Sequence, residues 1–176
     1  MAKIELFNAC KFCDAKCCRG LAVVLTIPEA IRLARAAGGN PADYIEITSV
    51  VDSKETPHYP IIVREMGALK EYFLILKKAG NGKDCVFLGQ AGACRIYADR
   101  PHVCRLYPFA LNGREMKKNA LCPVKFQREG YIGEAARLLE ADLHEHGRIV
   151  RAWLNANPGK RPQIGTFLEE AVKFIE

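Results

Sequence analysis

The residues of this sequence that could do chemistry are its eight cysteines, an unusual number for a chain of 176 residues. The first four follow the pattern C-x2-C-x3-C-C, and a C-x2-C turn lets two thiolates converge on one metal ion or cluster. The last four are more dispersed, as C-x8-C-x9-C-x17-C. A lone cysteine is most often a small buried hydrophobe, but this density predicts metal binding. The predicted ligands are Cys10, Cys13, Cys17, Cys18, Cys85, Cys94, Cys104 and Cys122.

The composition favours metal binding over disulfide formation. The start of the chain lacks the basic and apolar regions of a secretory signal, and the longest apolar runs, 21–25 and 72–76, are far shorter than the about 20 residues of a membrane span. We therefore expect a cytoplasmic protein that does not enter a membrane. Disulfides are rare in that compartment, where clustered cysteines more often bind metal.

The spacing of the cysteines favours iron over zinc. Structural zinc sites usually show two paired hooks, whereas only one clear hook is present here. Ligation by thiolates alone suits iron–sulfur clusters, whose cysteine spacings vary widely. We expect an iron–sulfur cluster of the 4Fe–4S type, with zinc as the alternative. Nearby arginines could donate hydrogen bonds to the sulfurs, or could be ordinary solvated side chains. They are Arg19, Arg95, Arg100 and Arg105.

The adjacent Cys17 and Cys18 bear on the number of centres. Adjacent side chains point in different directions in regular backbone, so both reach one metal only from a distorted turn. Eight cysteines also divide naturally into two groups of four. We expect one of the pair to join Cys10 and Cys13 at one centre and the other to join the dispersed cysteines at a second. The competing interpretation is one four-thiolate site with the remaining thiols free and buried.

Two segments together resemble a known family. The N-terminal segment contains CKFCDAKCC, and residues 85–109 read CVFLGQAGACRIYADRPHVCRLYPF. The sequence resembles the YkgJ-type cysteine-cluster family, a zinc- or iron-chelating domain named for its CxxCxxCC motif, although three residues here separate Cys13 from Cys17. Thr26, Glu29, Arg32 and Leu33 match the family's T-x-x-D/E-x-x-R-L helix, and Cys122 suits its trailing cysteine. The family is also distantly similar to flagellin lysine N-methylases, which implies iron–sulfur chemistry with S-adenosylmethionine.

The elements that must position these residues can be read from local signals. Thr26 and Glu29 have capping-box spacing and open a helix that Gly38 ends. Asn40 and Pro41 predict a second short helix to about Ile47, and the cysteine-rich segment 10–19 predicts a loop. Two β-prone runs, 59–66 and 69–78, predict a hairpin.

The second half of the chain is mostly helical by the same reasoning. A helix is expected after Pro101, and apolar residues at a period of 3.6 predict a long helix over 131–155. Thr166 and Glu169 predict the start of a last helix. The fold class is therefore α+β: a small antiparallel sheet with several helices, cysteine-rich metal-binding loops and a long C-terminal helix. We expect one domain over 1–176, with a metal-binding part over about 10–122 and a helical part over 131–176.

Two classes of function remain, and the sequence leaves open whether the protein is an enzyme. One is a redox or cluster-bearing module that works with a protein partner. The other is an enzyme resembling the lysine N-methylases, with S-adenosylmethionine as its small molecule, and a structural zinc protein is a further alternative. The compact length favours the first. The net charge of +6 is mild and the basic runs are short, so nucleic acid is not a favoured partner. His146 is expected to pack in the core, whereas His102, between Arg100 and Cys104, could be either a metal ligand or a group that supports one, or an ordinary histidine.

Overall fold

The computed structural model describes residues 15–49, 59–90, 92–112, 115–118 and 129–175, and it confirms the α+β class. The centre of the four-stranded antiparallel sheet is β4 (Ala68–Leu76). Strand β3 (Ile61–Glu65) pairs with the first part of β4, and β1 (Val24–Leu25) and β2 (Ile45–Thr48) pair with its last part. The predicted hairpin is therefore β3 and β4, joined at Met66 and Gly67.

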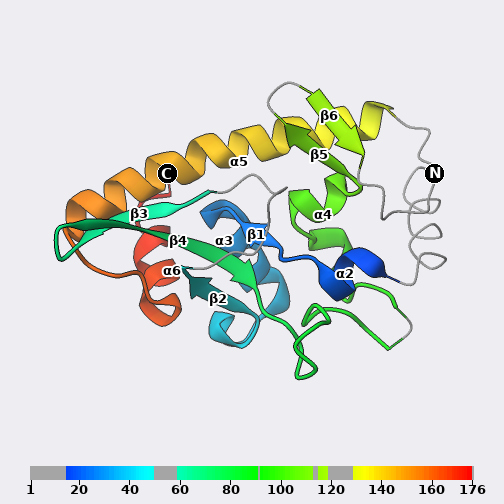
Figure 1. Cartoon of the computed structure of the whole chain (residues 1–176), viewed down its shortest axis with the longest axis horizontal. Coiled ribbons are helices and arrows are strands. Elements are labelled where there is room, and N and C mark those ends of the chain that lie inside the picture. The colour runs from blue at the N-terminus through cyan, green and yellow to red at the C-terminus, as the bar shows by residue number, and fades with distance from the viewer. Residues whose placement is uncertain (1–14, 50–58, 91, 113–114, 119–128, 176) are drawn as a thin grey trace.

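Helices surround this sheet. They are α2 (Lys16–Gly20), α3 (Ile27–Ala37), α4 (His102–Leu106), α5 (Glu129–Ala156) and α6 (Ile164–Val172). Single 3-10 turns, η1 (Pro41–Asp43) and η2 (Tyr97–Asp99), and a small hairpin of β5 (Phe109–Asn112) and β6 (Glu115–Lys118) complete the described elements. Figure 1 shows α5 along one side of the molecule, with α2, α4 and the small hairpin gathered near the end where α5 begins. No helix in the described part of the chain is long and apolar enough to cross a membrane.

Local capping signals fix helix α3 as predicted. The Thr26 hydroxyl accepts a hydrogen bond from the Glu29 amide, and the Glu29 carboxylate accepts one from the Thr26 amide at 2.9 Å. Gly38 ends the helix with φ +67°, a conformation that glycine adopts without strain. These contacts set the two ends of α3, the helix that follows the cysteine-rich segment and β1.

Three local predictions are wrong. Asn40 caps only the 3-10 turn η1, and the following β-branched residues form strand β2, because pairing with β4 and burial of Ile45 outweigh helix propensity. The predicted loop at the end of 10–19 includes the helical turn α2. The last helix begins at Ile164, before the Thr166 cap, with Gln163 at its N-cap and no side-chain cap.

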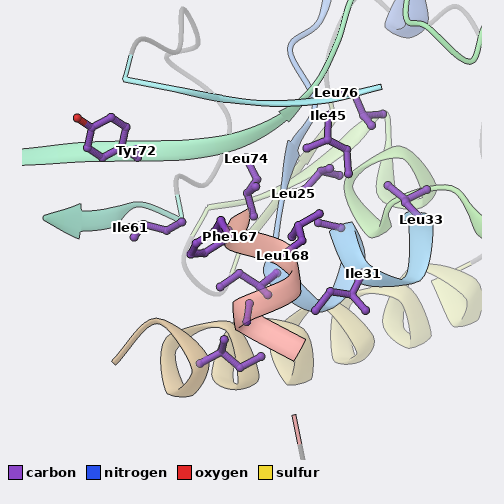
Figure 2. Close-up of a cluster of buried hydrophobic side chains, with 14 of the residues drawn as sticks. Leu25, Ile31, Leu33, Ile45, Ile61, Tyr72, Leu74, Leu76, Phe167 and Leu168 are labelled. Atoms are coloured by element: carbon purple, nitrogen blue, oxygen red, sulfur yellow. The ribbon is translucent and has the colours of Figure 1, made fainter. Parts of the chain in front are cut away.

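The core lies between the sheet and the helices. Figure 2 shows Leu25, Ile45 and Leu74 of the strands beside Leu33 of α3 and Phe167 of α6. These side chains are almost completely buried. Burial of apolar surface on this scale is the main stabilising term for the fold.

The long helix is fixed by Trp153 at its C-terminal end. Trp153 is fully buried, lies edge-on to Phe167 at 5.0 Å between ring centroids, and donates its indole N–H to Glu170 at 2.8 Å. The ring therefore fills the core while its single polar atom keeps a hydrogen-bond partner.

A buried histidine attaches α5 to the start of α3. The Nδ1 atom of His146 accepts a hydrogen bond from the Ile27 amide at 3.0 Å, so the ring must keep a lone pair there. Burial lowers the pKa of His146 to about 4, from 6.5 for an exposed histidine. His146 thus packs in the core, as the sequence predicts, and it is neutral at pH 7.

This histidine should make the fold sensitive to acid. The unfolded chain binds a proton at His146 near pH 6.5 and the folded chain only near pH 4, so stability must fall as the pH drops between these values. We expect His146 to remove about 2 kcal/mol from the free energy of unfolding between pH 7 and pH 5. In His146→Asn, whose amide oxygen replaces the Nδ1 acceptor, that part of the pH dependence should disappear. The free energy of unfolding is measured by urea unfolding at several pH values. If it falls equally between pH 7 and pH 5 in the two proteins, this prediction is wrong.

Candidate metal centre

Five of the eight predicted ligands lie in the described part of the chain, on two short helices and in two extended segments. Cys17 and Cys18 are on α2, Cys85 and Cys94 are in extended segments, and Cys104 is on α4. Cys85 is buried and the other four are partly buried, and none of the five forms a disulfide. The remaining predicted ligands, Cys10, Cys13 and Cys122, lie outside the described residues.

The turn of helix α2 lies directly against the segment that contains Cys85 and Cys94, which we call the second cysteine segment. The Cys85 amide donates a hydrogen bond to the Cys18 carbonyl at 2.6 Å. Isolated bridges between Lys78 and Cys85 and between Leu88 and Cys94 shape the rest of that segment. Parts of the chain that are far apart in sequence therefore bring Cys18, Cys85, Cys94 and Cys104 to one core cluster, and α2 lies near α4 (Figure 1).

The pKa values of the thiols show which of them share that region. Burial raises the pKa of Cys104, and the thiols of Cys18, Cys85 and Cys94 raise it further. Burial also raises the pKa values of Cys85 and Cys94, again with a contribution from Cys18. The Cys17 thiol is the main cause of the raised pKa of Cys18, whose Sγ atom lies 4.0 Å away. Cys17 is not among the main causes for the other three, so four thiols form one group and Cys17 lies at its edge.

Positive side chains surround this group of thiols. Lys78 and Arg100 lower the pKa of Cys18, and Arg95 lowers that of Cys85, each opposing the larger effects that raise it. Arg100 also packs over the Tyr97 ring at 3.7 Å. Such cations favour the thiolate form by charge, whereas the printed hydrogen bonds of Arg95 and Arg100 go to the Val86 and Tyr97 carbonyls.

The other two predicted arginines have different contacts. Arg19 forms an ion pair with Asp84 at 3.3 Å. Arg105 donates to the backbone carbonyls of Arg100 and Ala98. These contacts hold the segments around the thiols.

A second polar cluster lies on the N-terminal side of α4. The Glu29 carboxylate of α3 accepts hydrogen bonds from the Thr26 hydroxyl at 2.9 Å and from the His102 amide at 2.6 Å. The Nε2 atom of His102 lies 3.1 Å from the Asp142 carboxylate of α5. Arg32 completes the cluster through a two-pronged ion pair with Asp142. Glu29 and Asp142 belong to separate helices, so no spacing in the sequence could reveal the cluster.

The charges in this cluster support one another. Burial alone would raise the pKa of Asp142, but hydrogen bonds from His102 and Arg32 outweigh it and lower that pKa. The hydrogen bond to Asp142 likewise raises the pKa of Arg32. The ion pair is therefore charged over the whole physiological range.

Comparison with known proteins decides the family. A family model described as "CxxCxxCC: Putative zinc- or iron-chelating domain" matches residues 9–123. The chain belongs to the CxxCxxCC family. This match confirms the resemblance seen in the cysteine-containing segments, and it supports metal binding by the domain. No curated protein and no solved structure is significantly similar to the chain.

In this CxxCxxCC domain, Glu29 should be needed for stability. Its two oxygens accept from the Thr26 amide, the Thr26 hydroxyl and the His102 amide. Glu29→Gln replaces one oxygen by an NH2 group, which then faces a buried donor, so we expect a loss of about 1–3 kcal/mol in urea unfolding. The control is Glu140→Gln, at an exposed position of α5. If both substitutions change stability equally, the Glu29 hydrogen bonds do not hold α4 in place.

Proposed function

We propose that this protein carries cysteine-ligated iron–sulfur clusters of the 4Fe–4S type, in two centres, and acts as a redox or cluster-bearing module with a protein partner. The observation that carries the proposal is the group formed by Cys18, Cys85, Cys94 and Cys104, which pack at one core cluster and in which the first three thiols raise the pKa of Cys104. Four thiols in one place are the ligand set that a cubane cluster takes. The family match to a zinc- or iron-chelating domain agrees with this at the level of metal binding.

The spacing of the thiols favours iron–sulfur over zinc. A zinc–sulfur bond of about 2.3 Å in a tetrahedron brings each pair of sulfurs to about 3.8 Å. In the described part of the chain, no three thiols come as close as the ligand atoms of Glu29, His102 and Asp142, which all lie within 4.8 Å of one another. A cluster places iron and sulfide between the cysteines, so it suits a wider arrangement of thiols. This observation supports a cluster over a structural zinc ion.

The position of Cys17 supports a second centre. Its thiol is close to Cys18 but is not a main influence on the dispersed cysteines. In our proposal Cys18 joins the dispersed cysteines at one centre, while Cys17 joins Cys10 and Cys13 at the other. This assignment divides the adjacent pair, as the sequence suggests.

A carrier role accounts for the surroundings of the thiols better than a methylase role. Cys18, Cys94 and Cys104 are partly buried residues and Cys85 is buried, so a cluster there would lie close beneath the surface, where it could exchange an electron with a docked partner. The pocket beside them, lined by Glu29, Arg32 and His102 among others, has a volume of about 70 Å³. Sites for small organic molecules usually measure about 300–1,000 Å³. This pocket, in the described part of the chain, is therefore too small for S-adenosylmethionine.

Single and double substitutions of the adjacent cysteines test the two-centre proposal. Cys17→Ser and Cys18→Ser should each lose about half of the iron and sulfide of anaerobically purified protein, and the double variant should lose most of it. Brown colour with absorption near about 400 nm should fall in proportion. Ala22→Ser, at a partly buried position close by, is the control and should keep its iron. Full iron content in either single variant would refute the two-centre arrangement, and colourless protein with stoichiometric zinc would refute the cluster.

Removal of the metal should loosen α2 from the second cysteine segment. The proposed centre joins Cys18 to Cys85, in addition to the backbone hydrogen bond between these residues and the ion pair of Arg19 with Asp84. Because metal-binding free energy contributes to folding free energy, chelation should lower the melting temperature and make the segment around α2 sensitive to protease. An unchanged melting temperature after complete removal of metal would mean that the metal is not part of the fold.

A further inference from the structure

A group of potential metal ligands lies outside the thiols. Glu29, His102 and Asp142 come from α3, α4 and α5, and one ligand atom from each lies within 4.8 Å of the others. Glu29 and His102 are buried, and Asp142 is partly buried. Two carboxylates and an imidazole on three helices form a donor set suited to a divalent cation such as Mn²⁺ or Fe²⁺.

The imidazole of His102 has an unused nitrogen. Its side chain is only 8% exposed, and its Nδ1 atom is buried without a hydrogen-bond partner in the described part of the chain. The other nitrogen, Nε2, lies 3.1 Å from Asp142 and 3.2 Å from the Arg32 guanidinium. Neither tautomer gives Nδ1 a partner. The Nε2 atom, which lies beside the Asp142 carboxylate, is the nitrogen that would bind a cation together with Asp142, and the ring proton would then be on Nδ1.

Arg32 occupies the place of a cation in this group. Its guanidinium contacts both oxygens of Asp142 and the Nε2 atom of His102. The two carboxylates carry two negative charges and Arg32 supplies one positive charge, so a divalent ion in its place would balance them. The Arg32 side chain is 49% exposed, which lets it turn toward solvent when a metal binds.

The adjoining pocket provides access for an ion. Glu29, Arg32 and His102 form part of its lining, and its volume is about 70 Å³. A water molecule takes about 30 Å³ in the liquid, so the pocket has room for an ion and one or two waters. Arg100 and Arg105 line another part of the pocket and donate to the backbone carbonyls of neighbouring residues.

We propose that Glu29, His102 and Asp142 bind one divalent cation that prefers oxygen and nitrogen ligands, and that Arg32 competes with this cation for the site. Thiolates select softer metals and clusters, so this site would bind its ion separately from the cysteine centre. The inference stands independently of the cluster proposal, because none of its ligands is a cysteine.

Manganese binding tests the site on the full chain, purified anaerobically with its cysteine-bound metal. Mn²⁺ is titrated, and the free ion is followed by electron paramagnetic resonance. We expect one bound Mn²⁺ per chain, with pulsed spectra showing coupling to an imidazole nitrogen. Asp142→Asn and His102→Gln should weaken binding at least tenfold, and His102→Gln should also remove the nitrogen coupling. Arg32→Gln should tighten binding at least threefold, because it removes the competing cation, and Glu140→Gln should have no effect.

The Arg32 variant separates a metal site from a structural ion pair. Its side chain is half exposed, so the protein should fold without it, and a purely structural role gives no reason for tighter binding of manganese. The proposal is overturned if neither the unaltered chain nor Arg32→Gln binds Mn²⁺. It is also overturned if Mn²⁺ binds without nitrogen coupling and with equal affinity in Asp142→Asn. Iron and sulfide measured in the same samples report on the cysteine centre separately.

Discussion

The thiols of Cys18, Cys85, Cys94 and Cys104 share one region of the structure, where the first three raise the pKa of Cys104, and this crowding is the constraint that a metal centre would have to relieve. Without a metal they are stable only as neutral thiols, because thiolates so close together repel one another. A bound metal centre would reverse this balance by replacing the protons with positive charge. The four cysteines would then no longer repel one another but would link α2, through Cys18, to the rest of the domain.

The elements around the thiols are held by polar contacts at helix ends. Glu29 joins the start of α3 to the first amide of α4, and α4 carries Cys104. His146 joins the same end of α3 to α5. The first turn of α3 therefore holds both α4, which carries Cys104, and α5, against which α4 packs. Both contacts are buried, so breaking either leaves polar groups without partners.

Sequence reasoning succeeds where a signal is local. The capping box at Thr26, the glycine at position 38 and the β3–β4 hairpin need only neighbours in the chain, and the structure confirms them. It fails at β2, where Asn40 and Pro41 favour a helix but pairing with β4 decides the outcome. Tertiary contacts of this kind override local propensity.

The candidate site divides in the same way. The cysteines are visible in the sequence because their number and spacing are unusual, and the family resemblance follows from the residues between them. The grouping of Cys18 with the dispersed thiols, and the cluster of Glu29, His102 and Asp142, depend on segments that only the fold brings together. The sequence suggests a supporting role for His102 but offers no sign of its carboxylate partners.

The central claim, that the thiols hold an iron–sulfur cluster, is tested most directly by X-ray absorption spectroscopy of anaerobically purified protein. A cluster predicts an iron edge, a first shell of sulfur atoms and a second shell from neighbouring iron atoms. Cys18→Ser should weaken the iron signal while leaving the remaining iron in sulfur coordination. A zinc edge with a single sulfur shell at about 2.3 Å, and no metal–metal shell, would contradict the account.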